Sequence, residues 1–264
     1  MYGLYLRHCL IPSAGNKFVI ADFSQIEPRC LMWLVDDWET LGMIKKGFPI
    51  YEAYARKNLS WTGGNLKELS DTDEEAGRVY KTAKACVIGA GYGCGAEKFI
   101  TVAKAMANLD IGLEEATKII GDYRRSNKKI TSFWKTLEMA MKREARGNFS
   151  IELPSGRSMT YYDVTLKGGL TAVLGLGGKR YKFWGGVLTE NVCQAVARDV
   201  IRDAIINLEA AGITTLWTVH DEVICEVPVG FDSSKIRDIM VQEPSRMPGI
   251  PLGVSLKESQ FYKK

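Results

Sequence analysis

The sequence has few of the residues that mark zinc proteins or disulfide-bonded secreted proteins. It contains only two histidines, His8 and His220, and none of its six cysteines is part of a C-x-x-C pair. Most of these cysteines lie in apolar segments, which is typical of reduced, buried thiols in the cytosol. We therefore expect neither a zinc site nor a disulfide framework.

Long apolar runs are also missing. No segment approaches the length needed to cross a bilayer, and the first residues lack the pattern of a secretory signal peptide. There is no low-complexity segment and no internal repeat. These absences predict a globular protein that works away from membranes.

What is present fits that class. The chain has 264 residues, of which 46% are hydrophobic and 25% charged, enough for one large domain or two small ones. Its net charge is +4 and its isoelectric point is about 8.6. This mild excess of positive charge favours a polyanionic partner without identifying one.

The first 147 residues are predicted to be mainly helical after two short strands. Apolar patterning predicts strands at 3–11 and 17–21 and helices at 24–35, 50–59, 72–88, 97–108, 113–127 and 128–146. Asp71 or Thr72 is expected to cap the helix at 72–88, and Gly147 to end the last one.

The pattern changes at residue 148. A hairpin is predicted from 149–153 and 157–162, followed by a glycine-rich stretch at 165–184, a helix at 186–211, strands at 214–219 and 223–227, a helix at 232–243 and a strand at 252–257. A helical block from about 37 to 147 thus interrupts two β-rich ends. We predict an α+β fold, with one antiparallel sheet domain that is discontinuous in sequence and carries a helical insertion.

Acidic residues stand at the ends of two predicted strands. Asp22 follows an apolar strand, and Asp221 and Glu222 occupy a tight turn between two others. If the strands are neighbours, two or three carboxylates converge, and Mg²⁺ prefers such oxygen ligands together with substrate phosphates. The ordinary alternative is a solvated hairpin turn and a helix cap, and either motif alone favours it.

Several motifs together favour the metal-site interpretation over the solvated turn and the helix cap. The stretch DFSQIEPR (22–29) resembles motif A of family A DNA polymerases, and VHDE (219–222) resembles motif C. In KTAKACVIGAGYGCG (81–95), Lys84 and Tyr92-Gly93 have the spacing of motif B. The stretch 184–199 resembles the helix before motif C, especially in phage members. The motifs follow the order of the family, and the resemblance covers about residues 5–257.

This resemblance implies the architecture and the activity. Residues 1–36 and 148–264 are expected to form the palm, and 37–147 the fingers. The expected activity is template-directed addition of deoxynucleotides to a primer 3′-hydroxyl by a two-metal mechanism. Primer–template DNA, a dNTP and two Mg²⁺ ions are the implied partners. We expect a monomer in a bacterial or phage-infected host cytoplasm.

The resemblance also implies the catalytic residues. Asp22 and Asp221 are expected to bind the two metal ions, with the Phe23 carbonyl completing one shell. Glu222 adjoins this site, and a direct role and a supporting or solvated position are equally open. Lys84 is expected to contact the triphosphate and to protonate the departing pyrophosphate; the alternative is a solvated helix lysine.

The nucleotide-binding residues come from motifs A and B. Glu27 stands where the family has a steric gate against the ribose 2′-hydroxyl, although a glutamate in a first helical turn is also favoured by the helix dipole. Gln25 and Ile88 are expected beside the nucleotide. Tyr92 is expected near the templating base, or else in the core.

Contacts to DNA are expected from four further residues. Gln194 and Arg198 are four apart on one helix face and are expected at the minor groove of the primer–template. His220 is expected at the primer terminus, and the alternative is a core histidine. Arg29 is expected to order motif A or the primer strand, or else to form a surface ion pair. The basic and aromatic stretch 179–184 either follows a phosphate backbone or forms an exposed loop.

Two substitutions depart from the family pattern. Tyr80 stands where motif B has an arginine, and Lys81, which is closer than Arg78 to the stripe of Lys84, is the better replacement as a phosphate contact. Ile88 stands where the family has Phe or Tyr, which predicts altered discrimination of the sugar.

The third departure is length. Only 21 residues precede Asp22, so we expect the thumb, an upstream palm arginine and a 3′–5′ exonuclease to be absent and the grip on duplex DNA to be weak. The alternative function is a remnant that binds nucleotide or DNA without efficient extension. A metal-dependent nuclease or phosphatase is disfavoured, because it would not need Lys84, Tyr92 and Glu27 in these places.

Overall fold

The computed structural model describes residues 3–174 and 178–263, and the chain divides into two compact units. The first unit, here called the sheet unit, consists of residues 1–29 and 196–264. The second, the helical unit, consists of residues 30–195.

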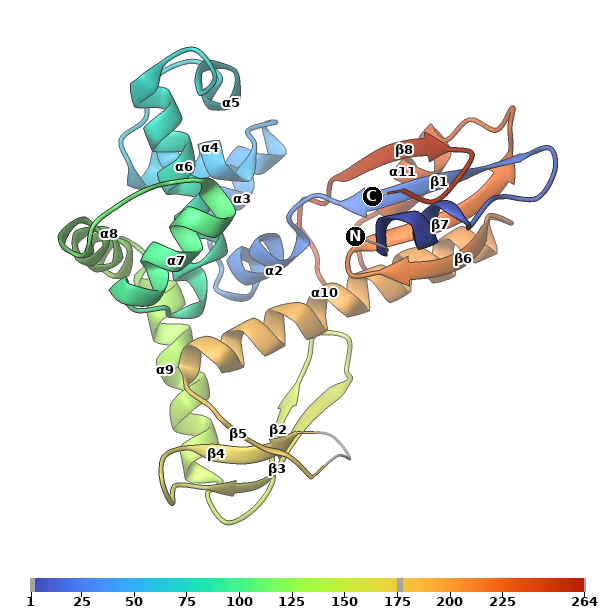
Figure 1. Cartoon of the computed structure of the whole chain (residues 1–264). Helices are drawn as coiled ribbons and strands as arrows, with labels where there is room; N and C mark the ends of the chain where they lie inside the picture. The colour runs from blue at the N-terminus through green and yellow to red at the C-terminus, as the bar shows by residue number, and fades with distance from the viewer. Residues whose placement is uncertain (1–2, 175–177, 264) are drawn as a thin grey trace. The chain divides into compact units, whose positions relative to one another are not determined.

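The sheet unit is built on four antiparallel strands in the order β6-β7-β1-β8 (Figure 1). Their bounds are β1 Asn16–Phe23, β6 Thr214–Val219, β7 Glu222–Pro228 and β8 Val254–Ser259. The strands predicted at 17–21, 214–219, 223–227 and 252–257 are therefore confirmed, with β8 displaced towards the C-terminus. Strand β1 lies inside the sheet, which explains its almost continuous apolar sequence.

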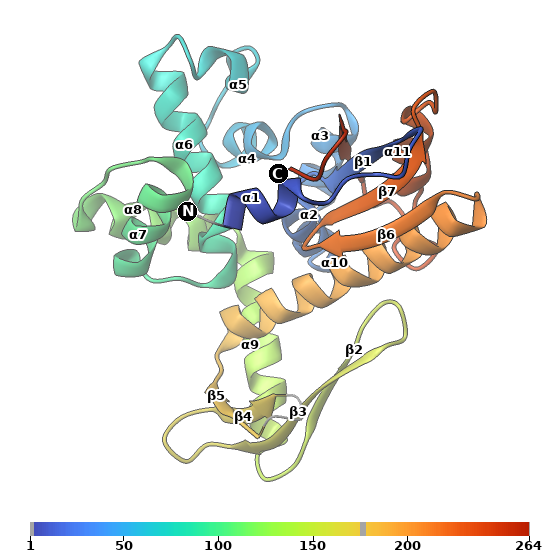
Figure 2. The same cartoon turned by 45° about the vertical axis from the view of Figure 1, so that its right-hand side comes forward.

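Alternation along the strands gives this sheet two apolar faces. On one face Phe18, Ile20 and Ile224 form a buried cluster with Tyr262, and Trp217 packs against it. Residues of the other parity, such as Val19 and Cys225, are also fully buried. Helix α10, Gly185–Ala210, enters this unit at residue 196 and runs along the sheet (Figures 1 and 2). Helix α11, Ser234–Met240, is shorter than the predicted 232–243.

The first predicted strand is wrong. Residues Gly3–His8 form a helix, α1, which Figure 2 shows near the C-terminal end of the chain. Both sides of β1 are already occupied, by β7 and β8, so the segment has no place beside the strand that follows it. A short apolar run fits a helix as well as a strand, and here the pairing of the other strands decides.

The helical unit contains most of the remaining helices. They are α3 Trp38–Lys45, α4 Ile50–Asn58, α5 Leu66–Leu69, α6 Glu74–Ile88, the 3₁₀ turn η1 Ala90–Tyr92, α7 Ala96–Ala107, α8 Leu113–Ser126 and α9 Lys128–Arg143; α2, Ile26–Leu34, joins the two units. Sequence patterning missed α3 and the four-residue α5. It also misplaced two caps: Asp73 caps α6, and α9 ends at Glu144 before Gly147 is reached.

A second antiparallel sheet belongs to the helical unit. Its order is β2-β3-β4-β5, with bounds Phe149–Glu152, Ser158–Thr165, Thr171–Leu174 and Arg180–Lys182. The predicted hairpin is confirmed as β2 and β3, whereas β4 and β5 arise from the glycine-rich stretch in which no strand was predicted. The α+β class is confirmed, but the expectation of one sheet domain is wrong, because the hairpin does not join the sheet of β1.

The boundaries between the two compact units lie at residues 29 and 195. The reason is that β2–β5 and the first half of α10 group with the helices, although their sequence resembles the β-rich ends. Assignment of these ranges to palm and fingers stays a prediction. Among the described residues, no helix is both long enough and apolar enough to cross a membrane.

Candidate functional site

The acidic residues of the sheet unit gather at one end of the sheet. Asp22, near the end of β1, is the register partner of Glu222, the first residue of β7. The backbone N–H of Phe23 donates to the carbonyl oxygen of Asp221 at 3.1 Å. Strand register therefore brings Asp22 and Glu222, which are 200 positions apart in the sequence (222 − 22), to adjacent backbone positions.

The turn between β6 and β7 has an unusual backbone. It consists of His220 and Asp221 alone, and His220 has a positive φ of 55°. Glycine is the residue that two-residue hairpins prefer where φ is positive, so a histidine here costs some conformational energy. Its side chain is exposed. The alternative of a core histidine is therefore wrong, and contact with a primer terminus stays a prediction.

Glu222 differs from the two aspartates in its surroundings. Its side chain is only 3% exposed, and the Tyr262 hydroxyl donates to its Oε2 at 3.1 Å. Burial, together with this hydrogen bond to a carboxylate, raises the pKa of Tyr262, so the phenol stays protonated and continues to donate. Asp22 and Asp221 are half-buried by comparison. These contacts favour a supporting position for Glu222.

The oxygen atoms at this end of the sheet suit a metal ion that is also bound by substrate phosphates and water. Among residues 3–174 and 178–263, no group of three or more His, Cys, Asp or Glu side chains could hold a metal ion. Mg²⁺ does not require such a cage, because it usually binds one or two carboxylates together with substrate phosphates and water. Asp22, Asp221 and the Phe23 carbonyl fit that pattern.

The connection from β1 to α2 is held by a buried arginine. Arg29 is 8% exposed, and its guanidinium donates to the carbonyl oxygens of Ser24 and Pro251, each at 2.7 Å. The Ser24 N–H donates to the Gly253 carbonyl at 2.8 Å. Arg29 is therefore not a surface residue, and these contacts order the segment that carries motif A. Direct contact between Arg29 and DNA stays a prediction.

The other two motif A side chains lie closer to solvent. Gln25 is exposed and has a positive φ of 47°, which the fixed strand-to-helix turn imposes. Glu27 is half-buried in the first turn of α2. A nucleotide contact by Gln25 and Glu27 stays a prediction.

The motif B residues lie along α6 in the helical unit. Lys81, Lys84 and Ile88 are all half-buried on this helix, which ends at Ile88. Tyr92 follows in η1 and is also half-buried, so it is not a fully buried core aromatic. Gly93 has a φ of 77°, a left-handed conformation in which glycine is favoured. Gly93 therefore ends the helical segment.

The Gly185-Gly186 pair fixes the end of motif B, and its importance was not recognised from the sequence. A Cβ at Gly186 would lie 2.0 Å from the Tyr92 carbonyl oxygen, and one at Gly185 would lie 2.3 Å from that of Trp134. The Trp134 indole donates to the Gly91 carbonyl at 3.0 Å. Backbone therefore packs directly on backbone where α9, α10 and η1 meet. The WGG stretch was the available signal, but spacing alone does not show what a glycine approaches.

The model of "DNA polymerase family A" matches residues 2–264. The chain belongs to DNA polymerase family A.

Two DNA polymerases are similar to this chain in sequence, and a solved polymerase domain is similar to it in fold. A DNA polymerase of Bacillus phage SP02 is 30% identical, over 98% of this chain and 43% of its own length. The thermostable DNA polymerase I of Thermus aquaticus is 29% identical, over 86% of this chain and 24% of its own length. The fold resembles a solved structure, the "POL domain of Pol1 from M. smegmatis complex with DNA primer-template and dNTP", with a TM-score of 0.68, 22% identity and coverage of 98% of this chain and 42% of that one. The chain thus spans less than half the length of these relatives.

Lys81 is predicted, ahead of Arg78, to replace the arginine of motif B. Arg78 is exposed and forms an ion pair with Glu115 of α8. Lys81 lines a cavity of about 500 Å³, whose charged lining residues are Asp71, Asp73, Glu74, Arg78, Lys81 and Asp110. Acids outnumber bases there, so the surroundings of Lys81 are less suited to a triphosphate than helical spacing indicates.

A second cavity of about 340 Å³ adjoins the end of motif B. It is lined by Gly93, Trp134, Trp184, Arg124 and Glu138, among others. Hydrogen bonds from Lys142 and from the Gly185 N–H lower the pKa of Glu138 below its ordinary value. The ionised Glu138 thereby anchors the start of α10.

The remaining expected DNA contacts are on the surface. Gln194 and Arg198 are both exposed on α10, whereas the neighbouring Asp199 is buried, with an oxygen 3.8 Å from Arg202. In the 179–184 stretch, Arg180–Lys182 form the exposed strand β5 and Phe183 is buried. That stretch is therefore partly an edge strand, which neither of its two interpretations anticipated.

Proposed function

We propose that the chain is the catalytic core of a template-directed DNA polymerase, which adds deoxynucleotides to a primer 3′-hydroxyl. The observation that carries this proposal is the meeting of motifs A and C: Asp22 pairs with Glu222, and Phe23 bonds to Asp221. Membership of family A supports it, as does the half-buried Lys84 on α6. In this proposal, residues 1–36 and 148–264 correspond to the palm and 37–147 to the fingers.

Two Mg²⁺ ions complete the proposed site. Asp22 and Asp221 would hold them, and the Phe23 carbonyl would supply a further oxygen ligand. When bound, such ions lower the pKa of the attacking hydroxyl and neutralise charge on the transferred phosphoryl group. Glu222, whose carboxylate accepts a hydrogen bond from Tyr262, holds its strand end in place.

Motif B and the first turn of α2 each supply proposed nucleotide-binding residues. Lys84 binds the triphosphate and donates a proton to the departing pyrophosphate, with Lys81 nearby on the same helix. Glu27 restricts the sugar, and Gln25 lies beside it. Ile88 packs on the nucleotide, and Tyr92 adjoins the templating base.

Primer–template DNA is the proposed polyanionic partner, and the protein acts as a monomer. Gln194 and Arg198 contact the minor groove, His220 contacts the primer terminus, and Arg29 keeps the motif A segment ordered. The resemblance in fold to a polymerase domain whose structure holds primer–template and dNTP supports these partners.

Primer extension tests the proposal. The wild-type chain is mixed with a 5′-labelled primer–template, Mg²⁺ and four dNTPs, and products are separated on a denaturing gel. We expect template-dependent elongation by the wild type and none by Asp221→Asn, in which a metal ligand is replaced by a neutral amide of similar size.

A binding measurement distinguishes the proposed polymerase from the alternative function, a remnant that binds nucleotide or DNA without efficient extension. Fluorescence anisotropy of the same labelled DNA is recorded with and without dNTP. DNA and dNTP binding by a chain that extends no primer, even at high enzyme concentration, would refute catalysis and favour a binding module.

A further inference from the structure

Tyr80, which occupies the arginine position of motif B, has a cation placed over its ring. The Lys67 Nζ atom of α5 lies 5.0 Å from the centroid of the Tyr80 ring. The Tyr51 ring of α4 meets Tyr80 edge-on, with centroids 5.8 Å apart. Tyr80 is one helical turn before Lys84 and lies on the same side of α6. Positive charge is thus supplied beside this position by a different element of the fold.

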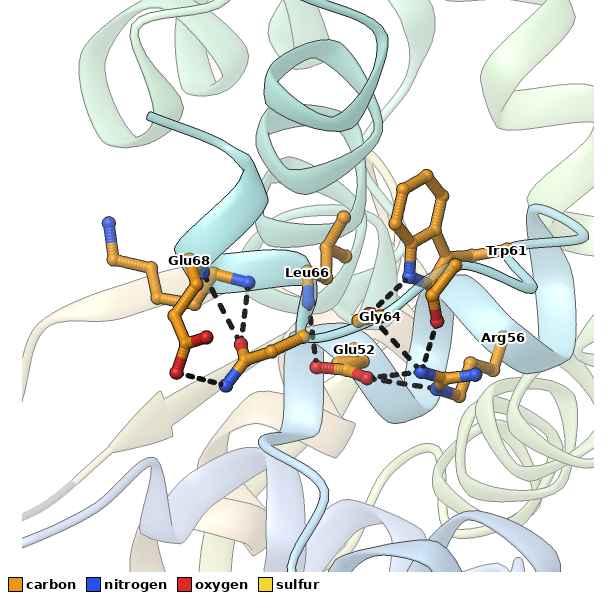
Figure 3. Close-up of polar contacts among 9 residues, drawn as sticks. Glu52, Arg56, Trp61, Gly64, Leu66 and Glu68 are labelled. Carbon is orange, nitrogen blue, oxygen red and sulfur yellow. Dashed lines mark hydrogen bonds and ion pairs between the residues drawn. The ribbon is translucent and has the colours of Figure 1, made fainter. Parts of the chain in front are cut away.

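The segment that carries Lys67 is anchored by a buried polar network (Figure 3). Glu52 is almost fully buried, and its Oε1 accepts hydrogen bonds from Arg56 at 2.6 and 2.9 Å. Its Oε2 accepts from the Leu66 N–H at 3.0 Å, at the start of α5. Arg56 in turn donates to the carbonyl oxygens of Gly63 and Gly64 at 2.7 and 3.3 Å. One ion pair of α4 therefore fixes the loop before α5 from both sides.

Further contacts within α5, and between α5 and its surroundings, fix this short helix. Asn65 caps α5 through its side-chain oxygen, and Leu66 is fully buried in the helical core. A Cβ at Gly77 of α6 would lie only 3.0 Å from the Ser70 carbonyl oxygen, so the two segments approach at backbone distance. The position of residue 67 relative to α6 is therefore set by buried groups, although its ammonium is exposed.

The surroundings of Lys67 suit a polyanion better than those of Lys81. Lys81 faces a cavity whose acids outnumber its bases. Lys67 lies over the Tyr80 ring and forms an ion pair with Asp71 at 3.7 Å, in which both side chains are more than half exposed. Such exposed pairs contribute little and are readily exchanged for a phosphate. Burial and the neighbouring Tyr80 raise the pKa of Tyr51 to about 12, so its hydroxyl remains a donor at neutral pH.

We propose that Lys67 is a nucleotide-binding residue, which contacts the triphosphate of the incoming dNTP from α5 where α6 carries Tyr80. The hydroxyls of Tyr51 and Tyr80 supply neutral donors beside it. This inference rests on the proposed polymerase function, and it assigns the missing cation to a different segment from the Lys81 of motif B.

Steady-state primer extension with one dNTP varied provides the test. We expect Lys67→Ala to raise the KM for dNTP by about tenfold, as loss of one charged hydrogen bond does, with kcat within about twofold of wild type. Lys118→Ala, at an exposed lysine of α8, is the matched control and should leave KM unchanged. Equal midpoints of thermal unfolding exclude a folding defect.

A second substitution makes the assignment specific. Tyr80→Arg places a cation on α6 itself, and in that background Lys67→Ala should change the KM by less than about threefold. A KM for Lys67→Ala that matches the Lys118→Ala control would overturn the inference, as would an equal effect of Lys67→Ala in both backgrounds.

Failure of the proposed function has a different signature. If the wild-type chain does not extend primers, dNTP binding is followed through the rise of the unfolding midpoint with dGTP and Mg²⁺. A smaller rise for Lys67→Ala than for Lys118→Ala would support the nucleotide contact without catalysis. Equal rises, or none in the wild type, would refute it.

Discussion

The acidic end of the sheet and the basic side of α6 are built in different ways. Asp22 and Asp221 are positioned by strand register and by a backbone hydrogen bond between their segments. Lys84 and Lys67 have long side chains on helices, and their position depends on how α4, α5 and α6 pack. A short acidic side chain at a strand end or in a tight turn has little freedom, whereas a nearby lysine can take over the role of another lysine. The acids should therefore be indispensable, and the bases partly redundant.

The largest effect should follow from breaking the acidic end. Asp22→Asn should lower kcat by about 10³-fold, because it removes about 4 kcal/mol of charge stabilisation by a metal ligand. Its register partner provides the matched variant: Glu222→Gln keeps an acceptor for Tyr262 and should cost less than about tenfold. Single-turnover extension measures both. Equal losses would show that Glu222 acts directly.

Breaking the basic side should have a smaller effect, spread over binding and rate. Lys84→Ala should lower kcat/KM for dNTP by about 100-fold, within the range observed when one transition-state donor is removed. Lys81→Ala, on the same helix, should cost less than about tenfold, because its cavity is acidic. A larger loss for Lys81 than for Lys84 would reverse this assignment.

The support beneath the acidic end can be tested through stability. Arg29→Ala should lower the free energy of unfolding by about 3 kcal/mol, because the partly buried Ser24 and Pro251 carbonyl oxygens lose a charged donor. Arg29→Lys should recover only part of this lost stability, because an ammonium group cannot reproduce the planar, forked geometry of a guanidinium. Urea unfolding measures both variants. A stable Arg29→Ala variant with weakened DNA binding would instead favour a direct DNA contact.

A subtler change concerns the side chain four residues after Lys84. Ile88→Tyr should change the preference between dideoxy- and deoxynucleotides by up to about tenfold, because a ring and an aliphatic chain pack differently on a sugar. Chain-termination assays at several ratios of the two nucleotides give this value. Identical termination by Ile88→Tyr and wild type would show that residue 88 does not face the sugar.

The smallest expected effect is a dependence on pH in the helical unit. The pKa of Glu138 is lowered, first by the hydrogen bond from Lys142 and then by that from the Gly185 N–H. Because the pKa of Glu138 is lower in the folded state, the ionised carboxylate contributes stability above pH 4.5, the ordinary pKa that applies to the unfolded chain. This contribution is lost as the pH falls through the lower folded-state pKa. In urea unfolding between pH 7 and 3, the free energy of unfolding should fall more steeply with decreasing pH for wild type than for Glu138→Gln. Parallel curves would contradict this.

Much of the fold and the acidic end could be predicted from sequence. Apolar strands flanked by Asp22 and by the His220–Glu222 turn indicate a sheet end, and the motif order indicates the family. Gly3–His8 was mispredicted because a short apolar run does not reveal that β7 and β8 already flank β1. The role of Gly185-Gly186 and the position of Lys67 depend on contacts between distant segments, which periodicity does not encode.

The approach of Gly186 to the Tyr92 carbonyl also sets the mutational tolerance of the molecule. With only 2.0 Å for a Cβ, any side chain at 186 must displace either η1 or the start of α10. In a library randomised at 92, 186 and 88, active clones should therefore vary widely at 88 and somewhat at 92, but return glycine alone at 186. A position without a side chain would then be the least replaceable of the three, because its contribution is the empty space that lets two backbones touch.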